Sequence, residues 1–201
     1  DGIERKTKSK IERLKSIVED GKGDYVDDAW YELGRTYMAE ERYKEGAQAL
    51  RDFTNTDTGS PYYISALSDL GLAYYNINQR SEALKCYEEV VAYDPQSSAA
   101  LEAMRGIREI YVGEGRIDDY FAYAERTGVE CDLSVMTRDS LSFRAAQNVY
   151  LANRKNEAIT HLKNYLADYP KGYYTNEALF CLSDCYLKCD SLDSAVASMK
   201  R

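Results

Sequence analysis

One spacing pattern, present twice along the chain, restricts the fold more than any other feature. Residues 30–37 read W-Y-E-L-G-R-T-Y and so contain W-x2-L-G-x2-Y. Residues 67–74 read L-S-D-L-G-L-A-Y, which repeats the order 37 positions later with leucine in place of the tryptophan. Residues three, four and seven apart lie on one face of a helix. Each copy therefore predicts a helix with one apolar stripe and a small residue within it.

The segment that follows the second copy predicts a partner helix. Ala83 and Tyr87 continue the apolar pattern, and Pro95 ends it because proline cannot donate the next backbone hydrogen bond. The polar residues 78–81 supply a short turn between the two helices. A small side chain at Gly71 or Ala83 lets the two antiparallel helices approach closely.

Weaker copies follow at the same offsets. The landmarks of a later unit are Ala145-Ala146, Val149, Ala158, Leu162, Tyr165 and Pro170. Those of the last are Leu179, Leu182-Ser183, Tyr186, Ala195 and Met199. The unit starts at 27 and 64, and at 139 and 176, are 37 residues apart, against about 34 in the usual form of this repeat. The excess falls in two similar aromatic linkers, Ser60-Pro61-Tyr62-Tyr63 and Lys171-Gly172-Tyr173-Tyr174.

The whole pattern resembles the tetratricopeptide repeat. This resemblance implies an all-α fold, a right-handed α-α superhelix of stacked helix pairs, without strands. The predicted units are residues 27–60, 64–97, a divergent 98–126, then 139–172 and a truncated 176–201. Residues 4–20 are the second helix of a preceding unit or a free capping helix.

The middle of the chain is the least regular part. Ala100-Leu101 aligns with Ala66-Leu67 at an offset of 34, whereas Ile117 aligns with Ser81 at 36. We therefore expect two extra residues in a stretched turn near 111–115. Residues 127–138 form an irregular connection, which could also divide the chain into two sub-arrays.

Two sequence segments point to one branch of this family. Ser60-Pro61-Tyr62-Tyr63 and the segment 164–170, N-Y-L-A-D-Y-P, are similar to the periplasmic repeat proteins of Gram-negative bacteria. Those include the Tol-Pal-associated repeat protein and lipoproteins of outer-membrane assembly. The resemblance implies envelope scaffolding in the periplasm and carries no catalytic residue. Five cysteines, an odd number, speak against an oxidising compartment, so the cytoplasm is the alternative.

Charge and hydropathy restrict the partners. The net charge of −8 repels nucleic-acid phosphates, so we expect no nucleic-acid partner. No apolar run reaches the roughly 20 residues needed to span a membrane. The expected partner is therefore a protein or peptide, and self-association stays open. The nineteen tyrosines suit half-buried positions and binding surfaces equally.

The sequence predicts neither catalysis nor a metal site or cofactor. Cys181, Cys185 and Cys189 lie on one helix face, but thiolates on adjacent turns make a poor tetrahedral cage, and small buried residues are the simpler interpretation. His161 has no accompanying nucleophile motif and is read as a surface residue. We therefore expect a protein that is not an enzyme.

Positions 5, 9 and 12 of each unit are expected to line the concave groove of the fold. The predicted partner-binding residues are Tyr31, Arg35, Met38, Leu72, Tyr75, Phe143, Gln147, Tyr150, Phe180 and Asp184. This aromatic and aliphatic stripe suits an extended peptide or a partner helix, although half of it could merely pack between helices. Tyr31 and Arg35 replace the Lys and Asn typical of chaperone-tail adaptors, which excludes that class. The alternative function is a structural spacer or self-association module of a longer protein.

Overall fold

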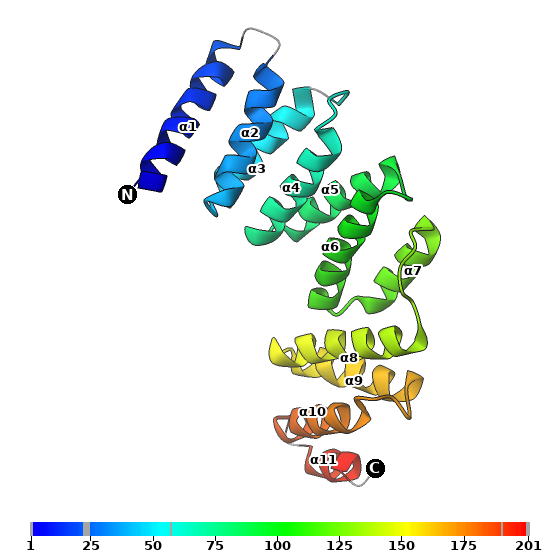
Figure 1. The fold of residues 1–201 in the computed structure, drawn as a ribbon. Helices are drawn as coiled ribbons and strands as arrows, with labels where there is room; N and C mark the ends of the chain where they lie inside the picture. The colour runs from blue at the N-terminus through cyan, green and yellow to red at the C-terminus, as the bar shows by residue number, and fades with distance from the viewer. Residues whose placement is uncertain (1, 22–24, 57, 190, 200–201) are drawn as a thin grey trace. The chain divides into compact units, whose positions relative to one another are not determined.

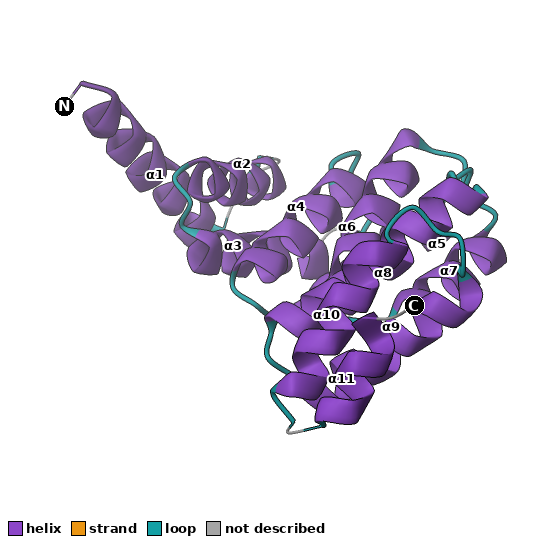
Figure 2. Cartoon of the chain, turned by 90° about the horizontal axis from the view of Figure 1, so that it is seen from below, coloured by secondary structure: helices purple, strands orange, loops and turns teal. Residues whose placement is uncertain are grey.

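The computed structural model describes residues 2–21, 25–56, 58–189 and 191–199, and within these ranges it contains helices and loops but no strand (Figure 2). Residues 57, 190, 200 and 201 of the predicted units lie outside the described residues. The helices are α1 (Gly2–Asp20), α2 (Val26–Ala39), α3 (Tyr43–Thr56), α4 (Tyr63–Asn76), α5 (Arg80–Tyr93), α6 (Ser98–Glu114), α7 (Ile117–Thr127), α8 (Val135–Leu151), α9 (Lys155–Asp168), α10 (Thr175–Leu187) and α11 (Leu192–Met199). The predicted all-α class is confirmed.

The chain forms two compact units, Asp1–Gly106 and Ile107–Arg201. The division falls within α6, and not at 127–138 where the sequence suggested that two sub-arrays could meet. In unit 1, α2 packs against α3, α3 against α4, and α4 against α5 (Figure 1). In unit 2, α8, α9, α10 and α11 pack in the same successive way.

One turn geometry recurs between the two helices of a pair. The backbone N–H of Arg42 donates to the Tyr37 carbonyl at 2.9 Å, five residues back, and Gln79 donates to Tyr74 in the same way at 2.8 Å. This six-to-one bond is the helix-ending motif that places a left-handed residue just before its donor. Glu41 and Asn78 fill that position with φ of 57° and 61°. The chain thus reverses without a long loop.

The third pair keeps this turn and lengthens its first helix instead. Gly115 takes the left-handed position with φ 79°, and Arg116 N–H donates to the Tyr111 carbonyl at 2.8 Å. Helix α6 has 17 residues, against 14 in α2 and in α4. The expected stretched turn near 111–115 was therefore wrong. Helical backbone absorbs the extra residues because each gains a hydrogen bond there.

The irregular connection is shorter than predicted. Helix α7 ends at Thr127, and Gly128 after it is left-handed with φ 70°. Ser134 caps the start of α8 by accepting a hydrogen bond from the Thr137 N–H at 3.3 Å. The guanidinium of Arg138 donates to the Leu133 carbonyl at 3.1 Å and lies 4.6 Å from the Phe121 ring centre. The connection therefore spans 128–134, and α8 starts four residues before the predicted unit start at 139.

Helix α1 packs against α2. Leu14 of α1 contacts the buried cluster that contains Leu33 and Tyr37, whereas Ile17 is exposed. Both a second helix of a preceding unit and a capping helix would pack in this way, so the assignment of residues 4–20 stays a prediction.

The expected close approach of the two helices at Gly71 is confirmed. A Cβ atom at Gly71 would stand 2.6 Å from the Tyr87 ring, and one at Gly106 would stand 2.6 Å from its other edge. Burial raises the pKa of Tyr87 to about 12, as expected for a ring enclosed between helices.

We expect Gly71→Ala to lower the free energy of unfolding by about 1–2 kcal/mol. Alanine is favoured in helices by roughly 1 kcal/mol, but overpacking a filled core costs about 1–3 kcal/mol. Urea unfolding followed by circular dichroism measures the change. In a Tyr87→Leu background the added methyl group meets no ring, so the same substitution should become neutral or stabilising. A stabilised single variant would contradict this account.

Candidate partner-binding site

All ten predicted binding residues lie on the first helices of their pairs, α2 and α4 in unit 1 and α8 and α10 in unit 2. Within each unit these first helices contact one another. Each unit therefore presents its own first-helix face, made of adjacent helices with side chains on a shared surface. The two faces are described separately.

The first-helix face of unit 1 exposes three of its five predicted residues. Leu72 and Tyr75 are exposed on α4, and Arg35 is exposed on α2. Met38 is half-buried, and its sulfur would lie 3.1 Å from a Cβ atom on Gly46 of α3. Met38 therefore packs between the two helices of its own pair, and the accessible patch consists of Arg35, Leu72 and Tyr75.

Tyr31 is buried and gives a partner little surface. Its ring stacks on Tyr62 of the aromatic linker, with 4.9 Å between centroids and 17° between planes, and lies 5.7 Å from Phe53. Burial raises the pKa of the Tyr31 hydroxyl, with a smaller contribution from Asp69. Tyr62 therefore covers the Tyr31 ring, which repeat position alone would leave exposed. The same stack holds the linker against the helix pair.

Unit 2 repeats this arrangement at Phe143. The Phe143 ring stacks on Tyr174 of the second linker at 4.7 Å and 4°, and it lies 5.6 Å from Tyr165. Phe143, Tyr165 and Tyr174 each stand 112 residues after Tyr31, Phe53 and Tyr62. Phe143 is thus also buried in packing. The recurring linkers were visible in the sequence, but their role in covering position 5 was not.

The first-helix face of unit 2 carries an exposed apolar row. Tyr173, Phe180 and Leu187 are spaced by seven residues and expose 82%, 71% and 43% of their surface. Residues seven apart return to nearly the same side of a helix. Phe180 and Leu187 therefore lie on one side of α10, and Tyr173 is exposed in the linker just before that helix. Phe180 and Leu187 stand at predicted groove positions, 5 and 12 of the last unit, whereas Tyr173 was not predicted.

A tyrosine–carboxylate–lysine group lies beside this row. The Tyr150 hydroxyl donates a hydrogen bond to Asp184 at 2.8 Å, and the Lys188 ammonium pairs with the same carboxylate at 2.5 Å. The bond to Lys188, and then that to Tyr150, lowers the pKa of Asp184. Asp184 is therefore ionised and already neutralised by Lys188. Gln147 is half-buried on α8.

The cysteines and the histidine do not form a reactive group. Burial raises the pKa of Cys181 and of Cys185, which keeps both thiols protonated. His161 is half-buried beside Gly115 rather than on the open surface that the sequence predicted. Within the described ranges no group of three or more His, Cys, Asp or Glu residues could hold a metal ion. None of the helices in those ranges could cross a bilayer.

Stacked helix pairs of this length with a shared turn define a class of helical repeat protein. Residues 27–57 and residues 64–97 each match a family model described as tetratricopeptide repeat. These two segments are therefore similar to tetratricopeptide repeats, a family that generally provides protein–protein interaction scaffolds and is in general non-catalytic. No curated protein sequence matches the chain.

One solved structure supports the fold. A tetratricopeptide repeat protein from Parabacteroides merdae ATCC 43184 is 14% identical, with a TM-score of 0.51 over 94% of this chain and 70% of that one. A structure of MamA, labelled AMB-1, is 16% identical with a TM-score of 0.46, over 89% of this chain and 90% of that one. At these identities the likeness concerns the fold alone, and the first of the two matches carries it.

Proposed function

We propose that the chain is a non-catalytic scaffold that binds a helix or extended segment of a partner protein on its first-helix faces. The observation that carries the proposal is the row Tyr173, Phe180 and Leu187. Single exposed apolar residues are common, but two exposed residues seven apart on one helix, with an exposed aromatic residue just before that helix, suit the anchoring of a partner helix. The ionised Asp184 is already paired with Lys188, so apolar contact dominates the recognition.

Unit 1 offers a second, smaller patch of the same kind. Leu72 and Tyr75 expose apolar surface on α4, and Arg35 adds a cation from α2. Arginine and tyrosine are enriched among residues that dominate binding energy. This patch suits a partner segment with one apolar side chain and one carboxylate.

The test compares two aspartate substitutions at exposed apolar positions. Phe180→Asp places a charge in the row on the first-helix face, whereas Leu192→Asp places one on α11, outside that row. We expect partners that co-purify with the wild type to co-purify equally with Leu192→Asp. The amount recovered with Phe180→Asp should fall at least tenfold, while its far-ultraviolet circular dichroism stays unchanged. Equal capture by both variants would contradict the proposal.

The same row could instead bury itself against a second copy, as in a spacer or self-association module. Light scattering over a hundredfold range of concentration separates the two functions. A monomer at every concentration supports partner binding. A dimer that Phe180→Asp dissociates and Leu192→Asp preserves supports self-association.

We also propose a periplasmic location with a role in envelope assembly, on the linker phrases described above; the cytoplasm is the alternative. All five cysteines are free, and Cys86, Cys181 and Cys185 are buried, where oxidants reach them poorly. Osmotic-shock fractionation of the host cells tests the location. Retention with cytoplasmic markers would refute it.

A further inference from the structure

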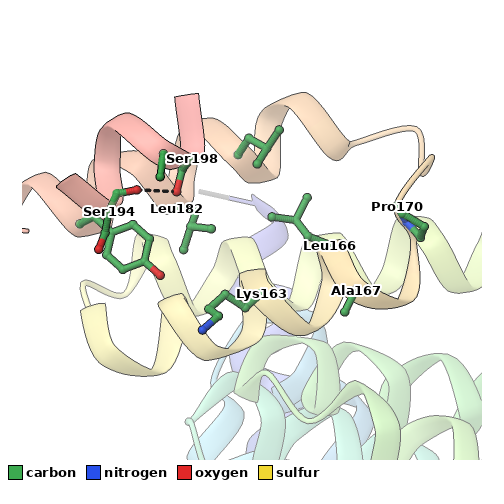
Figure 3. A pocket seen from close by; sticks show the side chains of 10 residues that line it. Lys163, Leu166, Ala167, Pro170, Leu182, Ser194 and Ser198 are labelled. Atoms are coloured by element: carbon green, nitrogen blue, oxygen red, sulfur yellow. Dashed lines mark hydrogen bonds between the residues drawn. The ribbon is translucent and has the colours of Figure 1, made fainter. Parts of the chain in front are cut away.

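A hollow separate from the apolar row lies between α9, α10 and α11 of unit 2. Its volume is about 600 Å³. Figure 3 shows Leu166 of α9 and Leu182 of α10 beside this space, with Ser194 and Ser198 on α11. Phe180 is not among the residues that line it. This α9–α11 groove is therefore a surface separate from the proposed first-helix face.

The same place recurs in unit 1, between α1, α2 and α3, where the hollow measures about 260 Å³. Six lining residues of unit 1 have equivalents 149 positions later that line the groove of unit 2. They are Trp30, Leu33, Tyr37, Glu45, Gln48 and Ala49, and their equivalents are Leu179, Leu182, Tyr186, Ser194, Ala197 and Ser198. The two hollows thus lie at equivalent positions of two repeats.

In unit 1 the indole of Trp30 lies at this position. Trp30 packs against the buried cluster of Ile11, Leu33, Tyr37 and Ala49, which joins α1, α2 and α3. In unit 2 the equivalent residue is Leu179, and Ser194 and Ala197 replace the longer Glu45 and Gln48. The side chains at these positions are therefore smaller on α10 and α11 than on α2 and α3.

A leucine at this position does not by itself leave a hollow. Leu67 occupies the equivalent place on α4 and exposes only 4% of its surface. Leu179 is half-buried at the same place on α10. Leu179 therefore stays partly accessible at a position where Leu67 is covered. In unit 1 the hollow is present although α4 and α5 follow α3.

We infer that the α9–α11 groove receives a tryptophan side chain of a partner protein, with an acidic residue of the partner beside it. The indole would lie where Trp30 lies in unit 1, against Leu166, Leu179 and Leu182. A buried indole N–H needs an acceptor. Ser198 supplies one, because its hydroxyl donates to the Ser194 carbonyl at 2.9 Å and keeps its lone pairs.

The charge at the rim selects the neighbour of that tryptophan. Lys163 of α9 lines the groove, is exposed, and forms no ion pair with a described residue. A carboxylate next to the partner's tryptophan can therefore reach an ammonium that is not already neutralised. Such a pair at a rim contributes orientation more than affinity.

The experiment titrates three small probes into the isotope-labelled full chain and follows its amide resonances. N-acetyltryptophan is expected to shift Leu166, Leu182 and Ser198 saturably at millimolar concentration. N-acetyltryptophan amide should bind at least threefold more weakly, since it lacks the carboxylate, and N-acetylleucine at least tenfold more weakly. Equal binding of the leucine and tryptophan probes, or no saturable shift at these residues, overturns the inference.

Variants assign the binding to the groove. Leu179→Trp installs the residue of unit 1 and should abolish the shifts, and Ala197→Gln does the same by a second route if the first variant fails to fold. Lys163→Gln should make the acid and the amide bind equally. Phe180→Asp should leave probe binding unchanged, which distinguishes this groove from the first-helix face. Shifts that persist in folded Leu179→Trp and Ala197→Gln overturn the assignment.

Discussion

Replacing Phe53 with alanine is expected to lower the free energy of unfolding of unit 1 by about 3–5 kcal/mol. Phe53 is fully buried on α3 and lies 5.7 Å from Tyr31, which in turn stacks on Tyr62. The substitution removes the inner ring of three and leaves a cavity behind the other two. Because Tyr62 belongs to the linker before α4, the loss weakens the contact between successive repeats as well as one helix pair.

Trp30 is the only tryptophan of the chain and lies in unit 1, so its fluorescence during urea unfolding reports on this change. Tyr93→Ala provides the control, since Tyr93 is 69% exposed on α5 and should change stability by less than about 0.5 kcal/mol. A loss below about 1 kcal/mol for Phe53→Ala would show that the aromatic group does not hold the linker.

Replacing Asp139 with alanine is expected to destabilise unit 2 by about 3 kcal/mol. The buried Asp139 carboxylate accepts a hydrogen bond from the Tyr165 hydroxyl at 2.6 Å and from the Tyr173 N–H at 2.7 Å. Removing a buried acceptor leaves its donors unpaired, at about 1–3 kcal/mol each. The Tyr165 oxygen also accepts from the Tyr174 N–H at 3.2 Å, so one carboxylate orders the whole second linker.

A double-mutant cycle with Tyr165→Phe isolates this interaction. Burial, and then the bond to Asp139, raises the pKa of Tyr165, so the hydroxyl donates throughout the physiological range. We expect a coupling energy of at least about 1 kcal/mol by urea unfolding. Asp27 is the matched control: it stands 112 residues before Asp139, and Phe53, the equivalent of Tyr165, has no hydroxyl. Asp27→Ala should therefore change stability by less than about 1 kcal/mol, and equal losses at the two positions would contradict this account.

Local pattern was sufficient to predict the helix pairs. The stripe at residues 67–74 and the small residue Gly71 depend on contacts within one pair, which a spacing of three, four and seven residues reports directly. The sequence placed the extra residues of the third pair in the connecting turn. Spacing alone does not distinguish a longer turn from a longer helix, because both add the same number of residues. Hydrogen bonding decides between them, and it favoured a longer α6.

The candidate site was predicted only in part. Repeat position alone assigned Tyr31 and Phe143 to the binding face, but the linker tyrosines Tyr62 and Tyr174 cover both. Tyr173, which is exposed in the linker before α10, received no role. A linker has no periodicity, so its side chains are placed by contacts made some 30 residues away along the chain, such as Tyr31 with Tyr62.

By itself the sequence therefore determined the repeat, its period and the helical class, because these arise from interactions between near neighbours along the chain. Only the tertiary structure decided which aromatic residues pack and which stay accessible, and that the position of Trp30 is an open groove at Leu179. Both outcomes depend on the distance between helices, which is set by the side chains of several elements together. No single repeat carries that information.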